Sequence, residues 1–130
     1  MNNKPTWDEY YFGIADAVSH RATCPRLRVG AVVVSKDNYI IGCGYNGAAA
    51  GFDECIDVGC RMEFGHCTRA IHAEMNAIRH TIISAGKKAL RGATMYVTHT
   101  ACEQCTKRAK HHGIERIVWK HEYRSGDEQL

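Results

Sequence analysis

The 130-residue sequence lacks a long apolar run, a strong net charge and any internal repeat or low-complexity tract. No apolar stretch approaches the ~20 residues that a membrane-spanning helix needs, and the opening "MNNKPTWDEYY" contains no signal-peptide core. The formal net charge of +3 suits a small anionic ligand but is too small to indicate a nucleic-acid-binding protein. We therefore expect one cytoplasmic domain over residues 1–130, with no membrane and no nucleic-acid partner.

The residues that are present predict a sheet covered by helices. Thr6 followed by Glu9 is typical of a capping box, which predicts a helix over "WDEYYFGIADAVSHRA". Two β-branched runs, "VGAVVVS" and "YIIGCGYN", flank "KDN" and predict a hairpin. A helix ending near Gly86, a strand "ATMYVTH", a short helix closed by Gly113 and a strand "IERIVW" should follow. The order predicts a three-layer α/β/α domain with a central mixed sheet, in which the last strand–helix–strand unit is parallel.

A Gly-rich segment, residues 47–69, lies between the hairpin and the second helix and shows no regular pattern. Loops of this length are usually functional or are held in place by something else. The segment also contains three of the seven cysteines. An odd number of cysteines without a secretion signal indicates metal binding or catalysis rather than a disulfide framework.

Two pairs of polar residues stand out at predicted helix starts. His72 and Glu74 lie in the otherwise apolar "IHAEMNAI", where their side chains cost desolvation energy unless something pairs with them. A capped helix with a satisfied histidine would explain that stretch alone. Cys102 and Cys105 form a C-x-x-C pair at a helix start, where thiolates are favoured. A redox pair or half of a zinc ribbon would explain that second pair alone.

The predicted topology brings both helix starts to the same edge of the sheet. One histidine and two thiolates then supply three ligands to Zn²⁺ and leave a fourth position for water, which is the pattern of a catalytic zinc. Glu74 would take the proton of that water and deliver protons to a substrate. H-x-E together with C-x-x-C is the signature of zinc-dependent deaminases, although Ala101 stands where that signature has proline.

The chain resembles the deoxycytidylate (dCMP) deaminase family. "VGAVVV", "GYNG", "HAEMNAI", "MYVTHTACEQC" and "GIERIVW" occur in the family's order and cover nearly the whole chain, although family members commonly have proline near Ala49. The resemblance implies a cytidine-deaminase-like fold and hydrolysis of dCMP to dUMP and ammonia, which feeds dTTP synthesis. It implies Glu74 as the catalytic residue and His72, Cys102 and Cys105 as zinc ligands. It also implies a homo-oligomer, such as a hexamer, that dCTP with Mg²⁺ activates and dTTP inhibits.

Two alternatives to dCMP deamination stay open. Deamination of free deoxycytidine or of a base in RNA is the alternative of the same class, and a zinc-binding module without catalysis is the alternative of another. Free-cytidine deaminases usually carry cysteine at the position of His72. Transfer-RNA adenosine deaminases and guanine deaminases share H-A-E but lack the GYNG segment.

Several residues outside the zinc constellation are candidates for substrate or effector binding. Asn46 offers a donor and an acceptor to a sugar hydroxyl or a base edge, and Gly44 and Gly47 permit close backbone approach to a ligand. A Gly-Asn turn at the end of the hairpin would also explain them. An arginine side chain is suited to binding a phosphate through its planar fork of N–H groups. The alternative for Arg26 and Arg28 is that they are exposed arginines without a ligand. The alternative for Tyr123 and Arg124 is that they lie in a disordered tail. The candidates are Arg26, Arg28, Asn46, Gly47, Ala73, His99, Tyr123 and Arg124.

The remaining cysteines suggest a second, closed zinc site that pins the 47–69 segment to the turn before the first strand. The candidate ligands are Cys24, Cys55, Cys60, His66 and Cys67, with Cys24, Cys55, His66 and either Cys60 or Cys67 favoured. Some viral members of the dCMP deaminase family resemble this chain in carrying an extra structural zinc there. Small buried cysteines and a loop disulfide are the alternatives.

Overall fold

The computed structural model describes residues 3–23, 27–47, 62–63, 66–67 and 72–121. The elements, in chain order, are α1 (Trp7–Ser19), β1 (Gly30–Val34), β2 (Ile40–Tyr45), β3 (Met62–Glu63), β4 (His66–Cys67), α3 (Ala73–Ala85), the 3₁₀ helix η1 (Lys87–Leu90), β5 (Thr94–His99), α4 (Glu103–His111) and β6 (Arg116–His121). Across these ranges, no helix is both long enough and apolar enough to cross a membrane.

Four strands form a mixed sheet in the order β2-β1-β5-β6. β1 is antiparallel to β2 and to β5, whereas β5 and β6 are parallel and are joined through α4, as the sequence predicts. β3 and β4 form a separate two-residue antiparallel ladder. The prediction of no regular structure over 47–69 is therefore wrong at these four residues, because two-residue strands are too short to leave a periodic signal.

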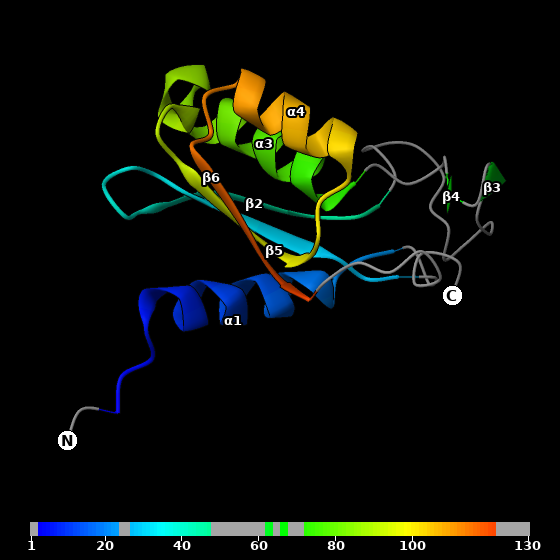
Figure 1. The fold of residues 1–130 in the computed structure, drawn as a ribbon, viewed down its shortest axis with the longest axis horizontal. Helices are drawn as coiled ribbons and strands as arrows, with labels where there is room; N and C mark the ends of the chain where they lie inside the picture. Colours follow the sequence, from blue (N-terminus) through cyan, green and yellow to red (C-terminus); the bar gives the residue numbers. More distant parts are fainter. Residues whose placement is uncertain (1–2, 24–26, 48–61, 64–65, 68–71, 122–130) are drawn as a thin grey trace.

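The helices cover both faces of the sheet, which confirms the three-layer α/β/α prediction. Figure 1 shows α1 on one face and α3 with α4 on the other. Val32 and Val34 of β1 pack in the α1 layer with Tyr11 and Tyr96, whereas Ala31 and Val33 belong to the cluster on the α3 side. Successive side chains of a strand point to opposite faces, so β1 must be apolar throughout.

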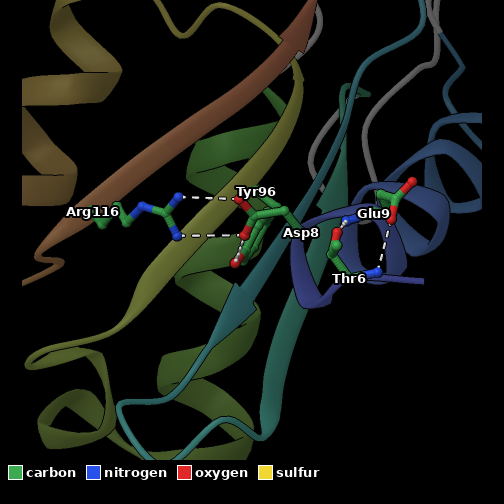
Figure 2. Close-up of polar contacts among 5 residues, drawn as sticks. All are labelled: Thr6, Asp8, Glu9, Tyr96 and Arg116. Atoms are coloured by element: carbon green, nitrogen blue, oxygen red, sulfur yellow. Dashed lines mark hydrogen bonds and ion pairs between the residues drawn. The ribbon is translucent and has the colours of Figure 1, made fainter. Parts of the chain in front are cut away.

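The predicted capping box forms at the start of α1. The Glu9 backbone N–H donates to the Thr6 hydroxyl at 3.1 Å, and the Glu9 carboxylate accepts from the Thr6 backbone N–H at 2.8 Å (Figure 2). The helix ends at Ser19, three residues before the predicted end at Ala22. The backbone N–H groups of residues 20–22 bond three residues back instead of four, which tightens the last turn.

Gly42 and Gly44 of β2 allow α3 to pack closely against this strand. A Cβ atom on Gly44 would lie 2.8 Å from the Ala73 carbonyl oxygen, and closer still to the Ala77 amide nitrogen. A Cβ atom on Gly42 would meet Thr81 in the same way. Gly44 therefore permits the close approach of a helix, rather than of the ligand that the sequence suggested.

Candidate metal centre

His72, Cys102 and Cys105 come together where α3 and α4 begin. His72 is the N-cap of α3, Cys102 is the N-cap of α4, and Cys105 lies in the first turn of α4. His72 Nδ1 lies 3.3 Å from Cys105 Sγ and 3.5 Å from Cys102 Sγ, and the three ligand atoms all lie within 4.8 Å of one another. In the part of the chain that the structure describes, no other group of three His, Cys, Asp or Glu side chains is placed to hold a metal.

The spacing of these atoms fits a tetrahedral zinc ion. Zinc–sulfur bonds of about 2.3 Å and zinc–nitrogen bonds of about 2.0 Å at the tetrahedral angle separate nitrogen from sulfur by about 3.5 Å. The two observed separations, 3.3 and 3.5 Å, are close to that value. An imidazole and two thiols are also a donor set that zinc prefers. Three protein ligands leave one position open, as catalytic zinc requires.

The pKa values of the two thiols are shifted in opposite directions. The pKa of Cys102 is lowered to about 4, because hydrogen bonds from the Cys105 thiol and from the His72 ring stabilise its thiolate. The backbone N–H of Cys105 also donates to that sulfur, at 3.3 Å. The same bond with Cys102, together with burial, raises the pKa of Cys105. Cys102 is therefore the more readily ionised of the two thiols, and binding of a cation would release the proton of Cys105.

Glu74 lies beside this group, two residues after His72. Its side chain is buried, with 5% of the residue exposed. Burial raises the pKa of Glu74, and the nearby Cys102 charge adds to the rise, whereas a bond from its own backbone, the His72 charge and a bond with Cys105 oppose it. A carboxyl group whose pKa moves toward neutrality is suited to taking up and releasing a proton.

Asn46 has protein partners for both ends of its amide. Its Oδ1 accepts from the Val29 backbone N–H at 2.7 Å, and its Nδ2 donates to the Leu27 carbonyl at 2.6 Å. Asn46 therefore ties the turn before β1 to the end of β2. Among the described residues these two bonds use one amide proton and one lone pair of Asn46, and nucleotide binding by Asn46 stays a prediction.

Four other candidate nucleotide-binding residues lie within the described parts of the chain. Arg28 is exposed, Ala73 is buried in the core, and a Cβ atom on Gly47 would lie 2.7 Å from Thr23 Oγ1. His99 is half-buried at the end of β5, with its Nδ1 3.1 Å from Thr98 Oγ1. Its ring centroid lies 5.3 Å from that of His121. Nucleotide binding by these residues stays a prediction.

The remaining candidates lie outside the described residues or are described only in part. Those outside are Cys24, Arg26, Cys55, Cys60, Tyr123 and Arg124. For His66 and Cys67 only the backbone of β4 is described. The second zinc site and the arginine contacts to phosphate therefore stay predictions.

Asn76 was not among the residues that the motifs singled out. It is a buried polar residue of α3 whose Nδ2 donates to the Tyr45 carbonyl at 2.9 Å. Its backbone N–H also donates to the His72 carbonyl at 3.1 Å. The sequence carries a signal for Asn76, which is an amide in an apolar helical run, four residues after a metal-ligand candidate. A buried amide at such a position needs a hydrogen-bond partner.

The sequence and the fold are both similar to known deaminases. Residues 5–121 match the protein family described as "Cytidine and deoxycytidylate deaminase zinc-binding region". The chain is 40% identical over 131 residues to a deoxycytidylate deaminase of Mycobacterium phage D29, covering 92% of this chain and 98% of that one. It is 42% identical over 120 residues to ComE operon protein 2 of Bacillus subtilis strain 168. That match covers 92% of this chain and 62% of the Bacillus protein, so this chain spans less than two thirds of that relative.

Among solved structures, the fold is similar to that of the dCMP deaminase from the cyanophage S-TIM5 in complex with dCMP and dUMP. The TM-score is 0.79 at 31% sequence identity, covering 98% of this chain and 90% of the phage chain. Together with the His–Cys–Cys group at the two helix starts, these similarities lead to one conclusion: the chain belongs to the cytidine and deoxycytidylate deaminase family.

Proposed function

We propose that the chain is a zinc-dependent enzyme that hydrolyses dCMP to dUMP and ammonia. The proposal rests above all on the placement of buried Glu74 beside a three-ligand group that fits zinc. Two relatives support dCMP as the substrate. One is the phage D29 deoxycytidylate deaminase, which this chain spans almost completely, and the other is the S-TIM5 enzyme in complex with dCMP and dUMP.

The positions of the residues support a proposed role for each. His72, Cys102 and Cys105 would hold the zinc. When bound, zinc supplies a Lewis acid that lowers the pKa of a water in its open position to about 7. Glu74 would take a proton from the attacking water and pass it to N3 of the cytosine ring, and would then take the proton of the hydroxyl group added at C4 and pass it to the amino group, which leaves as ammonia. Burial favours the protonated form of Glu74, so the carboxyl can hold a proton between the two transfers.

Further parts of the proposal rest on the resemblance to dCMP deaminases. The 5′-phosphate would be bound by Arg26, Arg28 or Arg124, with Tyr123 beside it. A structural second zinc, activation by dCTP with Mg²⁺, inhibition by dTTP, a homo-oligomer such as a hexamer and a cytoplasmic location belong to the same proposal. Replacing Arg124 with Gln should raise the KM for dCMP much more than the KM for deoxycytidine. Equal effects on the two substrates would place the phosphate elsewhere.

Ammonia release from dCMP, deoxycytidine and a cytosine-containing oligonucleotide tests the proposed function. We expect dCMP to be much the best substrate of protein purified under reducing conditions without chelator. Comparable turnover of deoxycytidine or the oligonucleotide would favour the corresponding alternative. Bound zinc without ammonia release from any substrate would indicate a non-catalytic zinc module. Metal analysis of the same samples should give two zinc ions per chain, falling to one in Cys55→Ser, and a single ion in the wild type would reject the second site.

A further inference from the structure

Three side chains of α3 bond to three backbone carbonyls of β2, in matching steps. The pairs are Asn76 Nδ2 with Tyr45 O at 2.9 Å, His80 Nδ1 with Cys43 O at 2.7 Å and Ser84 Oγ with Ile41 O at 3.3 Å. Four helical residues rise about 6.0 Å and two strand residues rise about 6.8 Å, so the two repeats nearly coincide. We call this set of three bonds the α3–β2 ladder.

The ladder covers an edge of the sheet. β2 is an end strand of the four-stranded sheet and pairs only with β1 among the described strands. In an antiparallel pair, every second residue points its backbone groups away from its partner, and the three accepting carbonyls have that spacing. The α3 side chains therefore satisfy carbonyls that an edge strand would otherwise present to solvent or to another chain.

The Asn76 bond differs from the other two. Asn76 is buried, whereas His80 and Ser84 are exposed, so water can replace the bonds of His80 and Ser84 more readily than that of Asn76. Ser84 Oγ also lies 2.9 Å from the His80 carbonyl, so its single proton is shared between two acceptors. The Asn76–Tyr45 bond is consequently the bond of the ladder that water replaces least readily.

Asn76 acts on the helical turn that carries the candidate chemistry. Its backbone N–H bonds to the His72 carbonyl, and the Ala73–Ala77 backbone rests directly on Gly44. Gly44 therefore sets how closely the first turn of α3 approaches the strand. The Asn76–Tyr45 bond sets the position of that turn along the strand.

We propose that Asn76 is a positioning residue for the zinc site. Its bond to the Tyr45 carbonyl fixes the first turn of α3 on β2, and so holds the His72 ring within reach of both thiols of α4 and Glu74 beside them. This inference rests on the proposed zinc function. It predicts that breaking the bond weakens zinc retention while the fold stays intact.

Asn76→Asp is the sharpest variant. It keeps the size of the side chain and places a negative charge near a helix N-terminus, where such a charge is favoured. It nevertheless replaces the donating N–H with an oxygen that faces the Tyr45 carbonyl oxygen. Asn76→Ala removes the donor without this repulsion and decides the question if the Asp variant does not fold. Ser84→Ala is the matched control, because it removes a donor from the far end of the same ladder.

The measurement is the rate at which a colorimetric chelator takes zinc from the full-length, zinc-loaded protein, with circular dichroism recorded under the same conditions. Loss of a residue that supports metal ligands typically costs 10- to 100-fold in metal affinity. We expect Asn76→Asp to release zinc faster by about that factor, Asn76→Ala to release it faster by less, and Ser84→Ala to match the wild type.

Two results would overturn the inference alone. The first is wild-type zinc release in both Asn76 variants. The second is equally accelerated release in Ser84→Ala, which would show a general loosening of α3 rather than positioning by Asn76. The proposed function fails separately, through a wild-type protein that holds no zinc on His72, Cys102 and Cys105 or that releases no ammonia from dCMP.

Discussion

Asp8 and Glu74 occupy equivalent positions in two helices that pack on opposite faces of the sheet (Figure 1). Each is the second residue after its helix N-cap, Thr6 in α1 and His72 in α3. Their proton affinities nevertheless change in opposite directions. The pKa of Asp8 is lowered, whereas burial raises the pKa of Glu74.

The surroundings of Asp8 explain its stability as an anion. The Tyr96 hydroxyl donates to its carboxylate at 2.7 Å and is the largest cause of the lowered pKa, and the Arg116 guanidinium donates to both carboxylate oxygens at 3.2 and 3.5 Å (Figure 2). These contacts join α1 to β5 and β6. The pKa of Tyr96 is raised to about 12, first by burial and then by Asp8, so the tyrosine remains a donor at neutral pH.

The contrast distinguishes a carboxylate that stabilises the fold from the carboxyl group that we propose to be catalytic. Partners stabilise the charge of Asp8, and the charge in return stabilises the fold. Glu74 is held where its charge is disfavoured, beside two thiols and a histidine. Natural proteins retain such an unfavourable group mainly where it has a task, which supports the proposal that the α3 face carries the chemistry while the α1 face stabilises the fold.

The largest effect should come from removing a proposed metal ligand on the sheet face that α3 and α4 cover. In Cys105→Ser, a weakly coordinating hydroxyl replaces a buried thiol that lies 3.3 Å from His72 Nδ1. Zinc affinity should fall well beyond the 10- to 100-fold expected for a supporting residue, and ammonia release from dCMP should cease. Zinc content and turnover of the purified variant check this. Cys43→Ser, at an exposed free cysteine of β2, is the control and should keep both.

Glu74→Gln should have the next largest effect. The amide cannot accept and return a proton, and general acid–base catalysis is worth about 10²- to 10⁴-fold, so kcat for dCMP should fall by at least that range. The zinc ligands are unchanged, so zinc content should match the wild type. Because a neutral amide replaces a desolvated carboxyl, the free energy of unfolding should stay the same or rise. Zinc loss in this variant would instead make Glu74 a metal-site residue.

Asp8→Asn should have a small effect, and on stability rather than on turnover. The ion pair with Arg116 is lost while the Tyr96 bond can persist, and both charged side chains are about half exposed. Chemical denaturation should show a loss of about 0.5–1 kcal/mol in the free energy of unfolding at pH 7, with turnover unchanged. Asp16→Asn, which removes the single contact to Lys120 from the same helix, is the matched control and should cost less.

The pH dependence of this small effect has a definite sign. Because the pKa of Asp8 is lowered in the folded state, its stabilisation is complete above the ordinary carboxyl value of 3.8. The stabilisation is lost as the pH falls through the lower folded-state value. The stability difference between the wild type and Asp8→Asn should therefore be constant from pH 7 to about pH 5 and should shrink below about pH 4. A difference that persists at pH 2 would mean that Asp8 acts through packing rather than charge.

Features that depend on a few neighbouring residues were predictable from the sequence. The Thr6–Glu9 capping box, the end of α3 before Gly86 and the parallel unit around α4 are all confirmed. The approach of His72 to the two cysteines was predictable as well, because each lies at a helix start and the topology places both starts at the same edge of the sheet.

Features that depend on the alignment of distant elements were not predictable. Asp8 meets Tyr96 and Arg116 across 88 and 108 residues, and no local pattern encodes that register. The amide of Asn46 bonds to backbone 17 and 19 residues away, and no local pattern encodes those two contacts. Gly44 and Asn76 gain their roles only when α3 lies along β2.

The most direct test measures dUMP formation from dCMP and the free energy of unfolding on the same zinc-loaded samples of wild type, Glu74→Gln and Asp8→Asn. We predict that Glu74→Gln loses at least about 100-fold in turnover and is no less stable, while Asp8→Asn keeps its turnover and is less stable. Wild-type turnover by a zinc-loaded Glu74→Gln protein would contradict the assignment of the chemistry to Glu74 and to the α3 face.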